Sequence, residues 1–74
     1  MNKAELIGEV SSKTGLTKKD TADVLDAMTE TIADTLSQGE KVALVGFGTF
    51  RIPAKRVPEF VPGKSLREKV KGGN

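Results

Sequence analysis

The sequence lacks the side chains on which most enzyme and metal sites depend. Its 74 residues include no cysteine, histidine, tryptophan or tyrosine. Without cysteine there are no disulfides or thiolate metal sites, and without histidine the commonest general base and metal ligand is missing. The acidic residues in the first half have the spacing of a solvated helix face, not of a paired acid/base site: Asp23, Asp26, Glu30 and Asp34. We therefore expect no enzyme, no metal site and no cofactor.

Long apolar runs are also missing. No run approaches the roughly 18 residues of a membrane span, and the N-terminus has no signal-peptide pattern. These features predict a soluble intracellular protein without a membrane or a small-molecule substrate among its partners. A chain of 74 residues makes one small domain, whose core rarely supplies more than about 3–5 kcal/mol. We expect a partner chain to complete the core.

Charge is distributed unevenly between the two halves of the chain. Residues 1–40 carry four basic and eight acidic side chains, a net charge of −4. Residues 41–74 carry eight basic and two acidic side chains, a net charge of +6. Such asymmetry indicates that one face meets a polyanion and the other meets water. A dipolar soluble domain without a charged partner explains the charge pattern equally well.

Helix start and stop signals divide the first half into two helices. Asn2 and Glu5 have the spacing of a capping box, and Gly15 is a typical C-terminal stop. Thr17 caps a second helix, which ends at Gly39. This helical pair has the length of a helix-turn-helix. The acidic residues of the second helix would face phosphates, however, which argues against reading of the major groove.

The second half predicts a β-hairpin, an extended segment and a short helix. Runs 42–45 and 49–52 flank a Gly-Phe-Gly turn, as in a hairpin. Three prolines between residues 53 and 62 exclude a helix there and favour an extended strand. Residues 62–70 read as a final helix, which Leu66 and Val70 dock while its basic residues project.

Three sequence blocks in this order resemble the bacterial HU/integration host factor family: residues 1–6 (MNKAEL), 46–50 (GFGTF) and 57–64 (VPEFVPGK). The resemblance implies an α+β fold with an N-terminal two-helix hairpin, a three-stranded antiparallel sheet and a short C-terminal helix. It also implies an intertwined homodimer that embraces double-stranded DNA through the minor groove. Within a single domain of residues 1–74, residues 1–40 would be the helical dimerisation part. Residues 41–74 would form a basic saddle for DNA.

Two sets of residues follow from this resemblance and from the charge pattern. The predicted dimer core consists of Phe47, Phe50, Phe60, Leu36, Ile32 and Leu44. A small chain with only three aromatic residues is expected to concentrate them where two subunits meet. The predicted DNA contacts are made by phosphate-binding side chains and by unobstructed glycine backbone: Lys3, Gly46, Gly48, Arg51, Lys55, Arg56, Lys64, Arg67 and Lys71.

The chain departs from the family after the GFGTF block. Family members extend the hairpin into a long basic arm, whose tip proline inserts between base pairs and kinks the duplex. Here Arg51 is followed directly by Ile52-Pro53-Ala54, and no Asn-Pro dipeptide occurs. Either the arm has been deleted, or the residues of a disordered arm are left out of the sequence. The second interpretation is favoured, because order is commonly lost at exposed hairpin tips.

The predicted function is sequence-tolerant binding and bending of duplex DNA by a homodimer. Such a protein would contribute to nucleoid compaction in the cytoplasm. Val61 occupies a position at which the family often has a basic residue, so no contact is expected from it. The alternative is a dimeric protein-interaction module whose basic face binds an acidic protein. An RNA binder fits less well, because it would usually expose aromatic side chains for stacking.

Overall fold

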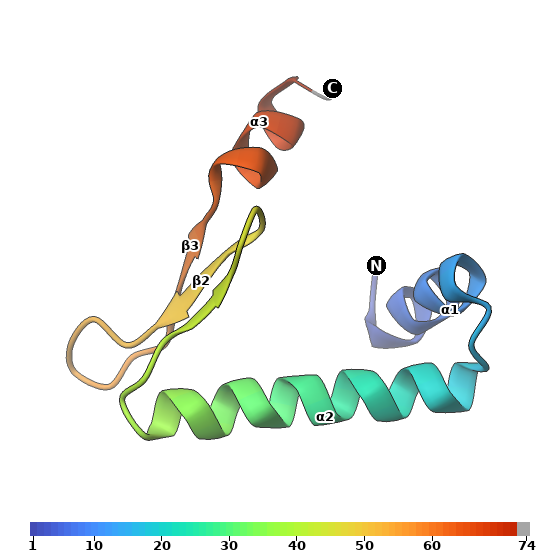
Figure 1. Cartoon of the computed structure of the whole chain (residues 1–74), viewed down its shortest axis with the longest axis horizontal. Helices are drawn as coiled ribbons and strands as arrows, with labels where there is room; N and C mark the ends of the chain where they lie inside the picture. Colours follow the sequence, from blue (N-terminus) through green and yellow to red (C-terminus); the bar gives the residue numbers. More distant parts are fainter. Residues whose placement is uncertain (73–74) are drawn as a thin grey trace. The chain divides into compact units, whose positions relative to one another are not determined.

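The computed structural model describes residues 1–72 and contains three helices and one sheet (Figure 1). In chain order the elements are α1 (Lys3–Thr14), α2 (Lys18–Ser37), β1 (Val42–Leu44), β2 (Gly48–Arg51), β3 (Glu59–Pro62) and α3 (Lys64–Gly72). The predicted α+β fold is confirmed. The chain divides into two compact units, the first formed by residues 1–31 and the second beginning at Ile32.

The first unit contains α1 and the N-terminal part of α2. At the start of α1 the Asn2 side chain accepts a hydrogen bond from the Glu5 N–H, and the Glu5 carboxylate accepts one from the Asn2 N–H, both at 2.9 Å. Gly15 ends α1 in the left-handed conformation, at φ 78°. The Thr17 hydroxyl accepts a hydrogen bond from the Asp20 N–H at 3.0 Å and so caps α2. The capping signals in the sequence are therefore confirmed.

The second unit is built around a three-stranded antiparallel sheet in the order β1-β2-β3. Val42 pairs with Phe50 across the first two strands, and Phe50 pairs with Phe60 across the next two. Side chains of paired residues lie on the same face of a sheet. The register therefore places Val42, Phe50 and Phe60 on one face. The Arg51–Glu59 pair lies on the other face, together with the Thr49–Val61 pair.

The aromatic side chains form the centre of the apolar face. The ring centroids of Phe50 and Phe60 are 4.8 Å apart, and those of Phe47 and Phe60 are 5.3 Å apart. Phe47 is nevertheless 48% exposed and Phe60 36% exposed. Within residues 1–72, Leu36 is the only large apolar side chain classed as buried. In the single chain the aromatic side chains therefore contact one another but remain partly exposed to solvent.

Two details of the second half differ from the sequence prediction. β1 stops at Leu44, and Val45 lies fully exposed in the turn, where Gly46 has φ 88°. In α3, Leu66 is half-buried, but Val70 is exposed, so the predicted docking by Val70 was wrong for the single chain. The reason is the position of α3, which follows β3 after one residue and extends beyond the end of the sheet (Figure 1).

Candidate nucleic-acid interface

The basic residues of α3 form the clearest candidate site. Lys64, Arg67 and Lys71 are separated by three and four positions, which places them on one side of the helix. Together with Glu68 they line a shallow depression on the surface. All three are exposed, and within residues 1–72 none has a carboxylate oxygen within 4.0 Å. We call these three residues the α3 cluster; its positive charges are available to an anionic ligand.

The hairpin tip is fixed next to the start of α3. The Gly63 N–H donates a hydrogen bond to the Phe47 carbonyl oxygen at 2.7 Å. A Cβ atom at position 63 would lie 3.2 Å from the Phe47 backbone, so the approach favours glycine. Gly46 and the N-terminal end of the α3 cluster are therefore held close together. Both would need to be close together to contact phosphates of the same DNA segment.

Gly48 differs from Gly46 in its surroundings. It is buried, and a Cβ atom there would lie 2.5 Å from the Phe60 ring and 2.7 Å from the Val61 carbonyl oxygen. Packing against Phe60 is a sufficient reason for a glycine at this position. The predicted approach of a DNA phosphate to the Gly48 backbone stays a prediction.

Arg51 is the predicted DNA contact on the polar face of the sheet, and it already has an acidic partner. Its Nε atom donates to the Glu59 carboxylate at 2.7 Å, across directly paired positions of β2 and β3. Lys41 and Arg51 each lie one residue beyond the Val42–Phe50 pair. Lys41, Arg51 and Glu59 therefore lie at the same end of the sheet.

The connection between β2 and β3 carries Lys55 and Arg56. Seven residues, Ile52 to Pro58, join the two strands. Lys55 has φ 57° and Arg56 has φ 56°, while the Val57 N–H donates to the Ala54 carbonyl at 3.3 Å. These features describe a tight turn with two central residues in the left-handed region, where side chains are disfavoured.

Replacement of Lys55 by glycine is expected to raise the free energy of unfolding by about 1 kcal/mol. The left-handed conformation costs an L-residue roughly 1–2 kcal/mol, and glycine avoids most of that cost. Urea unfolding followed by circular dichroism measures the change. Arg56→Gly relieves the same backbone conformation but loses a hydrogen bond from the guanidinium to the Ser37 carbonyl oxygen, at 3.3 Å. Its gain should be smaller, and no gain for Lys55→Gly would contradict the turn geometry.

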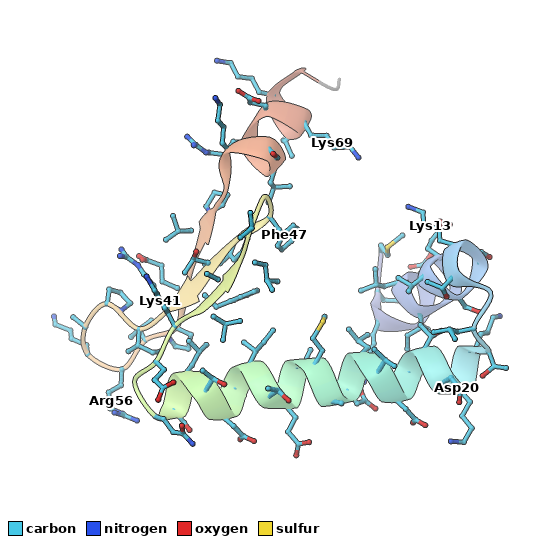
Figure 2. The ribbon with its side chains drawn as sticks, in the orientation of Figure 1. Lys13, Asp20, Lys41, Phe47, Arg56 and Lys69 are labelled. Carbon is cyan, nitrogen blue, oxygen red and sulfur yellow. The ribbon has the colours of Figure 1, made fainter. Side chains whose placement is uncertain are left out.

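The hydrogen bond of Arg56 also limits its availability to DNA. Figure 2 shows this side chain beside the end of α2, where Ser37 is the last helical residue. A guanidinium there satisfies a carbonyl that has no partner within the helix and complements the negative end of the helix dipole. Arg56 therefore has a structural contact in addition to its predicted role.

Lys3 belongs to the first unit and is paired within it. Its ammonium lies 2.6 Å from the Asp26 carboxylate, which links α1 to α2. Both side chains remain more than half exposed, so the pair adds little to stability. Sequence reasoning did not predict this pair, since the two residues are 23 positions apart.

Sequence reasoning also omitted Lys41 and Lys69 from the DNA-binding set. Lys41 directly precedes β1 and lies at the same end of the sheet as Arg51. The signal was present in the sequence, because the hairpin register predicts this placement once the turn is fixed. Lys69 projects from the middle of α3 (Figure 2). It lies two positions from Arg67, which places it off the side occupied by the α3 cluster.

Two other kinds of site are absent from the described residues. Residues 1–72 contain no group of three or more acidic side chains placed to hold a metal ion. No helix within the same residues has the length and apolar character needed to cross a membrane.

Comparison with known sequences decides the family. The model of the family described as bacterial DNA-binding protein matches residues 1–52, more than half of the chain. The chain belongs to this family. A DNA-binding protein HU from Thermotoga maritima is 43% identical over 90 aligned positions, which cover 96% of this chain and all of the relative. DNA-binding protein HU 1 from Bacillus subtilis is 38% identical over 91 positions, covering 97% and 99%.

Solved structures agree with the sequence relatives. A mutant HU from Thermotoga maritima superposes with a TM-score of 0.90 at 54% identity, over 95% of this chain and 99% of the other. An Anabaena HU–DNA cocrystal structure superposes with a TM-score of 0.88 at 44% identity, over 95% and 97%. The predicted family and fold are therefore confirmed.

Membership of this family makes the chain a DNA-binding protein and not an enzyme. The relatives give no support to the alternative of a module that binds an acidic protein. One difference is visible in the alignment lengths. The Thermotoga maritima relative aligns over 90 positions, whereas this chain has 74 residues, so the relative contains residues that this chain lacks.

Proposed function

We propose that the chain binds and bends double-stranded DNA as a homodimer, with little sequence preference, through contacts to phosphates. The observation that carries the proposal is the α3 cluster, whose three cations share one side of a helix and have no acidic partner among residues 1–72. Phosphate contacts hold a protein on a duplex without reading its sequence. In a bacterial cell this activity would contribute to nucleoid compaction in the cytoplasm.

The remaining predicted contacts divide according to their surroundings. Gly46 and Lys55 are exposed and extend the proposed surface from the α3 cluster along the second unit. Lys3 and Arg51 are ion-paired within the chain and would have to exchange or share their partners on binding DNA. Arg56, like Arg67 of the α3 cluster, donates a hydrogen bond only to a backbone carbonyl oxygen. We expect the α3 cluster to dominate affinity, because its side chains lose no existing ion pair.

Homodimerisation is supported by the uncovered apolar surface. The face formed by Phe47, Phe50 and Phe60 remains partly open in the single chain. A separate groove in the first unit is lined almost entirely by apolar side chains, among them Leu6, Val10, Leu25 and Met28. Exposed apolar surface on this scale is typical of a chain that completes its core with a second copy. Ile32, Leu36 and Leu44 are proposed to join that core.

The residues that the relatives possess and this chain lacks are proposed to lie between β2 and β3. The family match stops at residue 52, and only seven residues join the two strands here. Residues inserted there would extend the hairpin as an arm. The present chain has no Asn-Pro dipeptide to act as a wedge, so its bending of DNA would depend on wrapping the duplex against the basic surface.

The test is to measure DNA affinity over a series of salt concentrations for Lys64→Ala and Arg67→Ala. Each neutralised phosphate contributes about −0.9 to the slope of log K against log salt, and a homodimer carries each substitution twice. Each variant is therefore expected to bind duplexes of different sequence equally weakly, with a slope flatter by up to about 1.8. Fluorescence anisotropy with two duplexes of unrelated sequence measures both effects.

Lys13→Ala is the matched control, because Lys13 is an exposed cation at the end of α1 outside the proposed surface. It changes the net charge equally and should leave the slope almost unchanged. An equal flattening by Lys13→Ala would show that net charge alone determines binding. Unchanged slopes for both α3 variants would refute the assignment of the α3 cluster.

A further inference from the structure

We propose that Glu59 lowers the affinity of the sheet surface for DNA, because its carboxylate competes with phosphate for Arg51. The proposal rests on the DNA binding inferred above and assigns a function to an acidic residue within the basic half of the chain. The structure provides three observations that support it: the geometry of the pair, its exposure and its charged neighbour.

The geometry shows that the carboxylate occupies a position where a phosphate oxygen would bind. Arg51 Nε lies 2.7 Å from Glu59 Oε1, a distance typical of a charge-assisted hydrogen bond. Guanidinium groups bind carboxylates and phosphates through the same planar donor geometry. A phosphate approaching Arg51 must therefore displace Glu59 or bind next to its negative charge.

The exposure of the pair makes such an exchange feasible. The side chains of Arg51 and Glu59 are 51% and 44% exposed. Ion pairs at this exposure contribute little to stability, so breaking one does not threaten the fold. A buried pair would instead resist exchange, since a buried charge without its partner is strongly unfavourable.

Lys41 is a second cation at the end of the sheet that carries the Arg51–Glu59 pair. It lies with Arg51 at the end of the sheet where β1 begins and β2 ends, as Figure 2 shows for Lys41 at the base of the hairpin. Lys41 and Arg51 together carry a charge of +2, and the charge of Glu59 lowers the sum to +1. Glu68, which lines the α3 depression, lies on another element and forms no ion pair within residues 1–72. The constraint on Arg51 is thus specific to Glu59.

The decisive variant is Glu59→Gln, which removes the charge but keeps a side-chain oxygen able to accept the hydrogen bond from Arg51. We expect DNA affinity to rise roughly three- to tenfold at low salt, since exposed ion pairs are weak and the homodimer carries two of them. The slope of log K against log salt should become steeper by up to about 1.8, because Arg51 would then neutralise a phosphate in each subunit. Fluorescence anisotropy over a salt series measures both quantities.

Two controls separate this effect from a general change in charge. Asp34→Asn removes one negative charge from α2, where the carboxylate forms no ion pair within the described residues. It should leave the slope unchanged. In an Arg51→Gln background, Glu59→Gln should no longer increase affinity, because Arg51 is the ion-pair partner of Glu59 and is no longer present to be released. Circular dichroism confirms that each variant is folded.

Each result has one interpretation. Equal gains from Glu59→Gln and Asp34→Asn, or a gain that persists without Arg51, would show that net charge and not competition is responsible. Weaker binding by Glu59→Gln would show that Glu59 instead positions Arg51 for DNA. Either outcome overturns the inference while the proposed function stands. Absence of DNA binding by the unsubstituted chain would overturn the proposed function itself.

Discussion

Phe47→Ala is expected to lower the free energy of unfolding by about 3–5 kcal/mol, the usual cost of deleting a buried phenylalanine. Figure 2 labels Phe47 at the tip of the hairpin. In the single chain this residue is 48% exposed, so its truncation there would remove only part of the stability expected from a buried phenylalanine. A loss of the full size therefore requires that a second chain covers the ring. We expect the variant to be monomeric or unfolded at concentrations where the unsubstituted chain is a dimer.

Sedimentation equilibrium and urea unfolding at two protein concentrations measure both consequences. Val45→Ala is the matched control, because Val45 is fully exposed two positions away in the same turn. Its effect should stay within about 0.5 kcal/mol, as is usual for surface substitutions. A folded, dimeric Phe47→Ala protein with nearly unchanged stability would contradict the placement of this ring in a dimer core.

Local signals in the sequence predicted most of the secondary structure correctly. The capping box of Asn2 and Glu5 involves residues three positions apart, and Gly15 acts within a single helical turn. Such interactions depend little on the rest of the fold. The same holds for the α3 cluster, because helical periodicity alone places Lys64, Arg67 and Lys71 on one side.

Interactions between distant residues were not predictable in the same way. The Arg51–Glu59 pair depends on the register between β2 and β3, which a seven-residue connection does not determine from sequence alone. The Lys3–Asp26 pair depends on how two helices pack. A list of basic residues therefore predicted the composition of the candidate surface. It did not predict which cations are already engaged by acidic partners.

Exposure was the second property that the sequence did not provide. Val70 has the spacing of a docked residue but is exposed in the chain. The apolar pattern of a sequence indicates which residues need to be covered, and it does not distinguish cover by the same chain from cover by a second one. The same ambiguity applies to Met28, which is 49% exposed on α2.

Gly48→Ala is expected to destabilise the second unit by about 1–3 kcal/mol, the usual cost of overpacking. The added methyl group would lie 2.5 Å from the Phe60 ring and 2.7 Å from the Val61 carbonyl oxygen. The ring is held between Phe47 and Phe50, and the carbonyl belongs to the neighbouring strand, so neither can move away without disturbing the sheet.

Gly8→Ala provides the same chemical change in the opposite environment. Gly8 lies within α1, and a Cβ atom there would meet nothing within 4 Å. Alanine is preferred over glycine inside a helix by about 0.5–1 kcal/mol, so this variant should be stabilised. Thermal and urea unfolding of both variants measure the contrast. Equal effects of the two substitutions would contradict the close approach of Phe60 to Gly48. If Gly48→Ala destabilises the protein and Gly8→Ala stabilises it, the close packing of the Phe60 ring against the Gly48 backbone explains why β2 begins with glycine.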